Sequence, residues 1–174
     1  DVDGNGKKDL LAARNAEYNV NDGYIFLDST LTTNTLLGVD DADFHIEMNA
    51  SYLYLGELLA NAGDVDNDGR EDMLLRKLSY QYGPTEDHLI LSASLDWNNP
   101  VMDIEDSDFL IGGATVCPNG QDCSGQIGGV GDVNGDGYDD IAIEWISDST
   151  IQHDVSLFFG SSLLASGQSL SYTD

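Results

Sequence analysis

Residues 132–140 read Asp132-Val133-Asn134-Gly135-Asp136-Gly137-Tyr138-Asp139-Asp140. Oxygen-bearing side chains stand at positions 1, 3, 5 and 9 of this loop, and a glycine stands at position 6. Alternate residues of such a loop point inward, the glycine permits a sharp turn, and the backbone carbonyl at position 7 adds an oxygen. Because no Cys or His is among the ligands, the loop predicts a hard cation, and its flexible set of carboxylates favours Ca²⁺ over Mg²⁺.

The same pattern of oxygen ligands occurs twice more in the chain. Residues 64–72 read Asp64-Val65-Asp66-Asn67-Asp68-Gly69-Arg70-Glu71-Asp72, and residues 1–9 read Asp1-Val2-Asp3-Gly4-Asn5-Gly6-Lys7-Lys8-Asp9. One such cluster alone is typical of a solvated turn, but three copies with the same ligand positions favour three cation sites. These loops are not EF-hands, because their twelfth position carries Ala12, Leu75 or Ile143 instead of a bidentate Glu.

The loops begin at residues 1, 64 and 132, which indicates an internal repeat. A second landmark keeps the same spacing, since Asp41-Ala42-Asp43-Phe44 recurs as Asp106-Ser107-Asp108-Phe109. We therefore treat the chain as a single array with repeats at 1–63 and 64–131 and an incomplete repeat at 132–174.

Each repeat contains short apolar runs that are typical of β-strands. One run follows each loop, a second follows a polar turn, a third is centred on the Asp-Phe landmark, and a fourth leads into the next loop. Short runs bounded by Gly, Asn, Asp and Ser favour strands over helices. Four antiparallel strands in each repeat predict an all-β fold, namely a β-propeller-like array of about two and a half four-stranded blades.

The third loop and its flanking strands resemble the FG-GAP repeat of integrin α-subunit propellers and related bacterial surface proteins. The resemblance rests on residues 131–143, which read GDVNGDGYDDIAI, and on residues 157–161, which read LFFGS. Members of that family hold calcium in the loop between the first two strands of a blade. They serve as extracellular platforms for adhesion or ligand binding, and the resemblance implies the same fold and role here.

The resemblance also implies about three calcium ions, each held by side chains at positions 1, 3, 5 and 9 and by the backbone carbonyl of position 7. The implied ligands are Asp1, Asp3, Asn5, Lys7 and Asp9 in the first loop, Asp64, Asp66, Asp68, Arg70 and Asp72 in the second, and Asp132, Asn134, Asp136, Tyr138 and Asp140 in the third.

The balance of charge limits the classes of partner. The 174 residues include 32 acidic and 6 basic side chains, which give a formal net charge of −26. Three bound calcium ions would still leave about −20. Such a chain repels nucleic acid and anionic membrane surfaces, so neither is expected as a partner. No apolar run approaches the ~20 residues of a membrane-spanning helix.

Cys117 and Cys123 flank a five-residue stretch rich in turn-forming residues, and so close a pair predicts a disulfide that closes a small ring. The alternatives are a redox-active pair or two ligands of a zinc site, which lacks a second Cys/His pair at ligand spacing. A disulfide implies an oxidising compartment, so we expect an extracellular or cell-surface location. Asn49-Ala50-Ser51 is a glycosylation sequon.

No pattern in the sequence identifies a catalytic nucleophile, so no enzymatic activity is expected. The three histidines, His45, His88 and His153, stand in no nucleophile motif, and no Gly-x-Ser-x-Gly occurs. Adjacent acids could serve a glycosidase, but so many acidic residues produce such pairs by chance. The aromatic side chains that could stack on a glycan, contact a protein or pack within the fold are Trp97, Trp145, Tyr80 and Tyr82.

An array of fewer than three blades needs further blades to close, because known propellers have at least four. We expect these from other copies of the chain, in a ring or filament, or from a longer chain. The expected function is a calcium-stabilised extracellular module for adhesion, recognition of a protein or glycan, or surface structure. One alternative is a subunit of a homopolymeric filament or ring, and another is an enzyme built on the same scaffold.

Overall fold

The computed structural model describes residues 1–16, 20–31, 36–47, 53–79, 86–112, 124–147, 152–167 and 169–171. Strands dominate these ranges, which confirms the all-β expectation. The strands are β1 (Leu10–Ala16), β2 (Val20–Phe26), β3 (Phe44–Glu47), β4 (Leu53–Gly63), β5 (Asp72–Ser79), β6 (Glu86–Ile90), β7 (Val101–Asp103), β8 (Phe109–Gly112), β9 (Ser124–Gly131), β10 (Asp140–Ser147), β11 (Gln152–Phe158) and β12 (Ser169–Ser171). The helical segments there are η1 (Val39–Asp41), η2 (Ser92–Ser94), η3 (Ile104–Asp106) and α1 (Gly160–Ser166).

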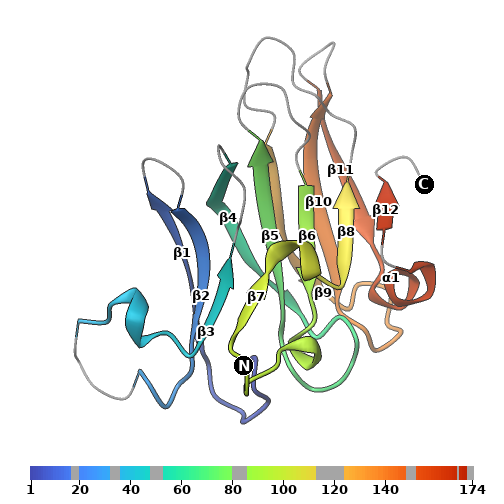
Figure 1. The fold of residues 1–174 in the computed structure, drawn as a ribbon. Coiled ribbons are helices and arrows are strands. Elements are labelled where there is room, and N and C mark those ends of the chain that lie inside the picture. The colour runs from blue at the N-terminus through green and yellow to red at the C-terminus, as the bar shows by residue number, and fades with distance from the viewer. Residues whose placement is uncertain are drawn as a thin grey trace.

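The described strands form three open sheets (Figure 1). The first sheet has the order β1-β2-β3-β7, the second β12-β8-β6-β5-β4, and the third β11-β10-β9. In each sheet, the strand that follows a loop pairs antiparallel with the next strand of the chain. Leu74 thus lies opposite Leu89 in the second sheet, and Ala142 lies opposite Leu157 in the third.

The second sheet contains one strand of each of the four predicted kinds, but β4 comes from the predicted first repeat, and the strand that ends the second repeat, β9, lies in the third sheet. β4 leads into the second loop, β5 and β6 follow the loop, and β8 begins at Phe109 of the Asp-Phe landmark. Their pairings, β4 with β5, β5 with β6 and β6 with β8, are all antiparallel. The third sheet repeats the first three of these strands as β9, β10 and β11.

Two short strands depart from the expected antiparallel pattern. β7 follows β6 in the chain but pairs in parallel with β3 of the first sheet, and β12 follows β11 but pairs in parallel with β8 of the second. Each therefore extends the sheet of the preceding repeat. Runs of three residues are too short to show a period, and α1 spans about two turns, so the sequence predicted none of these elements.

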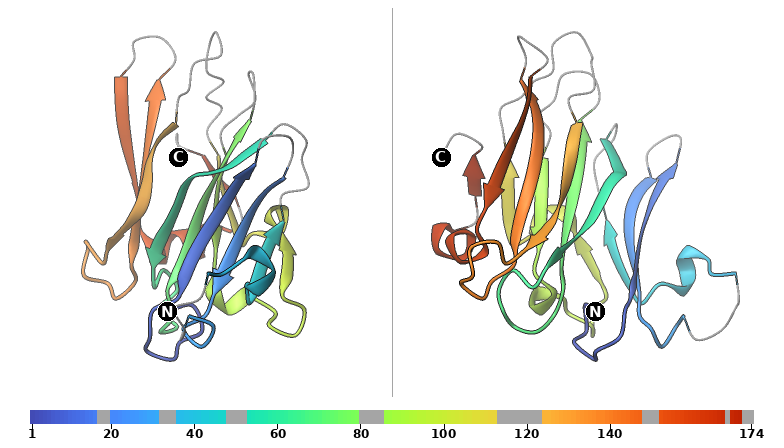
Figure 2. Two further views of the ribbon diagram at one scale, coloured as in Figure 1. Left: turned by 90° about the vertical axis from the view of Figure 1, so that its left-hand side faces the viewer. Right: turned by 180° about the vertical axis from the view of Figure 1, so that it is seen from behind.

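Two apolar clusters hold the three sheets together. One lies between the first and second sheets and includes Ile25, Phe44, Ile46, Met73, Leu75 and Ile90. The other lies between the second and third sheets and includes Val65, Leu74, Leu89, Ile127, Ile141 and Ile143. Figure 2 shows the third sheet, in orange, packed against the second, in front of it in the right-hand view. Residues that alternate along β5 face opposite clusters, as the period of a strand requires.

A buried ion pair lies within the second sheet, at its boundary with the third. The Arg76 guanidinium on β5 donates to both carboxylate oxygens of Asp87 on β6, with Nε–Oδ1 and Nη2–Oδ2 distances of 2.6 and 2.9 Å. It also donates to the backbone carbonyls of Gly125 and Glu144 in the third sheet. Both charged side chains are almost completely buried, so each depends on the other for compensation.

The helical segments within the described ranges are too short and too polar to cross a lipid bilayer.

Candidate metal centres

The three acidic loops lie at the same end of the sheets, at the bottom of Figure 1 near the N-terminus. Each loop is followed by the equivalent strand, β1, β5 or β10, and these strands leave the loops in equivalent hairpins. The repeat in sequence therefore becomes a repeat in space.

The side chain at position 1 organises the backbone of each loop. In the second loop, the Asp64 carboxylate accepts hydrogen bonds from the backbone N–H groups of Asp68 and Gly69, both at 2.9 Å. Asp1 and Asp132 accept the same pair of bonds in their own loops, at 2.7–3.0 Å. The residue at position 3 also accepts from the N–H of position 5 in all three loops.

Positions 1, 3 and 9 converge in the first two loops. One carboxylate oxygen from each residue lies within 4.8 Å of the other two in the group, and the residues are Asp1, Asp3, Asp9, Asp64, Asp66 and Asp72. Three carboxylates so close repel one another unless a cation or protons compensate them. Their all-oxygen donor set fits a hard cation such as Ca²⁺, which takes six to eight oxygen ligands.

Position 5 is turned toward its own loop. The side-chain oxygens of Asn5, Asp68 and Asp136 accept hydrogen bonds from the backbone N–H of position 7, at 2.9–3.1 Å. Asp68 is accordingly absent from the group of converging carboxylates in the second loop. Positions 7 are Lys7, Arg70 and Tyr138, whose carbonyls are the predicted backbone ligands.

The third loop offers fewer carboxylates at the converging positions. Positions 1 and 9 carry Asp132 and Asp140, but position 3 is not acidic, so no group of three converging carboxylates forms among the described residues of this loop. The Asp136 carboxylate instead accepts from Ser161 Oγ at 2.6 Å and from Asn134 Nδ2 at 3.0 Å. The hydrogen bond from Ser161 is the main reason that the pKa of Asp136 lies below its usual value. This loop also has a neutral Asn134 at position 3.

The aspartate at position 9 has a second role that the sequence did not reveal. In the second loop, one Asp72 oxygen accepts from the Val65 N–H at 2.8 Å and the other from the Ser92 N–H at 2.9 Å. Asp9 and Asp140 accept the equivalent pairs, and their donors are Val2, Asp28, Val133 and Gly160. Each carboxylate thus joins the start of its loop to the end of the following hairpin.

The second loop contains two carboxyl groups whose pKa is raised. Burial raises the pKa of Asp72 to about 7, although hydrogen bonds from Ser92 and Val65 oppose the shift. Burial also raises the pKa of Asp66, and the neighbouring Asp68 carboxylate adds to this effect. A cation between these groups would favour their charged forms. A cation bound in the second loop would therefore oppose the effect of burial on both groups.

Neighbouring loops are joined through position 8. The Asp139 carboxylate of the third loop accepts from the Asp64 N–H of the second at 2.9 Å, and the Asp139 N–H donates to the Asp64 carbonyl at 3.0 Å. The Glu71 carboxylate and N–H pair with the amino group and carbonyl of Asp1 in the same way, at 2.8 and 2.9 Å. The sequence did not indicate a role for Glu71 or Asp139, because position 8 is not a ligand position.

The aspartate of each Asp-Phe landmark stabilises a turn by accepting hydrogen bonds. Asp43 accepts from the Leu27 N–H at 2.8 Å, and Asp108 accepts from the Leu91 N–H at 2.7 Å. Each aspartate takes a second bond from a hydroxyl group, of Thr30 or Ser94. The repeated spacing of the landmark could have indicated this structural role, since both copies brace the same turn.

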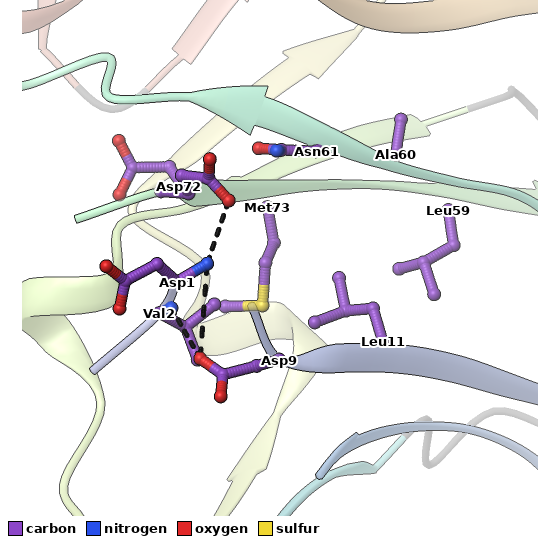
Figure 3. Close-up of a pocket in the computed structure, with 10 residues that line it drawn as sticks. Asp1, Val2, Asp9, Leu11, Leu59, Ala60, Asn61, Asp72 and Met73 are labelled. Carbon is purple, nitrogen blue, oxygen red and sulfur yellow. Dashed lines mark hydrogen bonds and ion pairs between the residues drawn. The ribbon is translucent and has the colours of Figure 1, made fainter. Parts of the chain in front are cut away.

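A small cavity opens beside the first loop, between the first and second sheets. Its volume is about 130 Å³. Figure 3 shows Asp1, Asp9 and Asp72 at its polar end and Leu11, Leu59 and Met73 along its apolar side. The cavity thus brings the position 9 aspartates of two loops to the same sheet boundary.

The histidines occupy different environments. His88 is buried, its Nδ1 lies 2.9 Å from Ser107 Oγ, and its Nε2 has no hydrogen-bond partner among the described residues. Burial lowers the pKa of His88. His45 stacks on Tyr24 with ring centroids 4.9 Å apart, and its Nε2 lies 3.1 Å from the Asp22 carboxylate.

Several sequence predictions fall on residues that the structure does not describe. Cys117, Cys123, Asn49, Tyr80 and Tyr82 lie outside the described residues, as do the side chains of Trp145 and His153. Trp97 packs edge-on against Phe44, with ring centroids 5.5 Å apart, and so belongs in part to the first apolar cluster.

No protein-family model matches the chain, and none of the curated proteins matches it.

Proposed function

We propose that the chain is a calcium-stabilised array of FG-GAP-like, propeller-type repeats, which acts outside the cell as a non-catalytic module for adhesion, recognition or surface structure. The observation that carries the proposal is the hydrogen-bond plan shared by the three loops, in which position 1 folds the loop and position 9 fastens it to the next hairpin. In the first two loops this plan gathers three carboxylates within 4.8 Å.

Calcium would act on stability through these carboxylates. Their mutual repulsion weakens the folded state, and a bound divalent ion would remove it, so folding and binding should be linked. A site filled at 100 times its dissociation constant adds about 2.7 kcal/mol to the free energy of unfolding. Three such sites would be comparable with the ~5–15 kcal/mol that stabilise an ordinary domain.

Thermal unfolding with and without calcium tests the proposal. We expect EDTA to lower the melting temperature by more than about 10 °C, and calcium to restore it far better than magnesium at equal concentration. Isothermal titration should give up to three sites. A melting temperature that is the same in EDTA and in calcium would overturn the calcium part of the proposal.

A second candidate is a subunit of a ring or filament, in which further copies complete the array. The third sheet favours it, because Val155 and Leu157 on one of its faces are exposed to solvent. Light scattering in calcium tests this candidate, since a ring or filament scatters as a multiple of the chain mass.

The enzymatic alternative would rest on Ser107 and His88. Their side chains are hydrogen-bonded, a carboxylate oxygen of Glu86 lies 3.8 Å from His88 Nε2, and both residues border a polar cavity of about 370 Å³. A neutral imidazole could accept the serine proton. Under the non-catalytic proposal, a fluorophosphonate probe should not label the protein. Labelling that disappears in Ser107→Ala would favour the enzyme instead.

A further inference from the structure

At the boundary between the second and third sheets, the later repeat covers residues of the earlier one. Four residues of the second sheet and its loop, Ala62, Val65, Asp87 and Leu89, are each 0 % exposed. Ala62, Val65 and Leu89 belong to the apolar cluster that the third sheet completes with Ile127, Ile141 and Ile143. Asp87 is compensated by Arg76, which also contacts the third sheet.

The equivalent residues of the third sheet are apolar and exposed. The second and third loops begin at 64 and 132, and the same shift of 68 residues relates the two sets. Val130, Val133, Val155 and Leu157 are 44, 53, 68 and 46 % exposed. We call these four residues the open face of the third sheet. Since they occupy the positions that a following repeat covers in the second sheet, the open face has the form of an unused repeat boundary.

A backbone feature beside the open face is also unused within the described ranges. At the second loop, the Asp139 side chain packs on Gly63, where a Cβ would overlap it, and bonds the Asp64 N–H. The equivalent pair in the third loop is Gly131 and Asp132. Gly131 has the same left-handed backbone, with φ of 73° against 84° at Gly63, but no atom lies within 4 Å of where its Cβ would be. Gly131 and Asp132 thus form an empty cradle for a carboxylate.

We propose that the open face, with the Gly131–Asp132 cradle, is a docking surface for a further repeat of the same kind that carries Asp or Glu at position 8 of its loop. Its carboxylate accepts the Asp132 N–H, and its own N–H donates to the Asp132 carbonyl, as Asp139 and Glu71 do at the two boundaries already formed. A charge-assisted bond of this kind gives the docking its specificity.

The need for an acidic residue at position 8 decides whether a second, identical copy of the chain can supply the further repeat. The first loop of a second copy carries Lys8 at position 8, and an ammonium group has no acceptor for the Asp132 N–H. The matching face of the first sheet is open, since Leu10 is 45 % exposed, whereas the equivalent Met73 is buried. Lys8 therefore opposes direct head-to-tail docking of identical copies, which weighs against a ring or filament formed through this face, and the occupant is a repeat with an acidic residue at that position.

The substitution Lys8→Glu tests the proposal, because it supplies the missing carboxylate on a second copy. Lys8→Met is the matched control, since it loses the same ion pair with Glu71 without adding an acceptor. Lys8 is 76 % exposed, so both variants should fold, and melting curves will check this. In calcium, sedimentation equilibrium should give a self-association constant about tenfold higher for Lys8→Glu than for Lys8→Met, the effect of one added charge-assisted hydrogen bond.

A second substitution checks that the association uses the open face. Adding Leu157→Glu to Lys8→Glu should return association to the level of Lys8→Met. Equal association of Lys8→Glu and Lys8→Met, or association that persists with Leu157→Glu, would overturn the proposal. The inference rests on the repeat-array part of the proposed function and not on calcium binding. A calcium-sensitive melt with no effect of Lys8→Glu would therefore reject the docking inference alone.

Discussion

The second and third sheets are built from equivalent residues, yet the second is covered on both faces and the third on only one. Leu89 is fully buried, whereas Leu157, at the same place in its hairpin, is 46 % exposed. The two loops differ in the same sense, because Asp64 is bonded by the following loop through Asp139 and Asp132 has no such neighbour among the described residues. The burial of these equivalent residues therefore depends on the neighbouring repeat more than on a repeat's own sequence.

The largest difference between the sheets should come from the buried ion pair of the second sheet, whose Arg76 also bonds to the third. Arg76→Ala removes the guanidinium that pairs with the buried Asp87 carboxylate, and we expect the free energy of unfolding to fall by about 3–5 kcal/mol. The control is Arg70→Ala, at a partly exposed side chain whose nearest carboxylate, of Asp68, lies 3.8 Å away, where less than about 1 kcal/mol is expected. Urea unfolding measures both, and equal losses would contradict the role of Arg76 at the boundary.

Truncating the equivalent leucines of the two sheets tests whether their difference in burial affects stability. Leu89→Ala should lower the free energy of unfolding by about 2–5 kcal/mol, because it opens a cavity in the cluster between the second and third sheets. Leu157→Ala removes the same atoms from an exposed position, and less than about 0.5 kcal/mol is expected. Large losses for both would show that the open face is covered in solution.

Exchanging the residues at position 3 should bring the two loops closer in calcium affinity. Asp66→Asn removes one of the three converging carboxylates from the second loop, and Asn134→Asp adds a carboxylate to the third. Since calcium affinity follows the charge of the ligands, we expect about a tenfold loss in the first case and a similar gain in the second. Isothermal titration with calcium measures both. A gain without the corresponding loss would show that Asp66 is not a ligand.

The smallest effect is a dependence on pH that only the second sheet should show. The second sheet buries His88 where the third has Ser156. Burial lowers the folded-state pKa of His88 below its ordinary value of 6.5, with Lys77 acting in the same direction and Glu105, Glu86 and Asp87 opposing it. The unfolded chain therefore takes up the proton first. The contribution of neutral His88 is fully present above about pH 6.5 and declines as the pH falls below it.

The substitution His88→Gln removes this titration. We expect melting temperatures measured between pH 7 and pH 5 to fall less steeply for His88→Gln than for the unsubstituted protein. An unchanged slope would mean that His88 does not titrate differently in the folded and unfolded states.

Local sequence patterns predicted the hairpins and the loops. They did not predict the contacts between repeats. The runs after each loop became β1, β5 and β10 because a short apolar run between turn residues has few other stable conformations. The ligand positions brought together by the structure, such as Asp64 and Asp66, are also neighbours in sequence. The parallel strand β7, by contrast, depends on contact with β3, more than fifty residues earlier.

Side chains with a role at a repeat boundary were missed for the same reason. Asp139 has the composition of an ordinary loop residue, and only its contact with Asp64 gives it a role. Arg76 lies in a strand where a charged residue would normally face solvent, and its burial depends on Asp87 and on two carbonyls of the third sheet. A sequence repeat locates such positions, but the partner of each residue is known only once the sheets are placed together.

The parallel strands β7 and β12 have a mechanical consequence. The second and third repeats each place a strand in the sheet before it, so neighbouring repeats cannot be pulled apart without breaking the β3–β7 or β8–β12 ladder. In a parallel pair the backbone hydrogen bonds are evenly spaced along both strands, so each ladder joins the two repeats at several points. Neighbouring repeats are in this way connected by backbone hydrogen bonds as well as by side-chain packing.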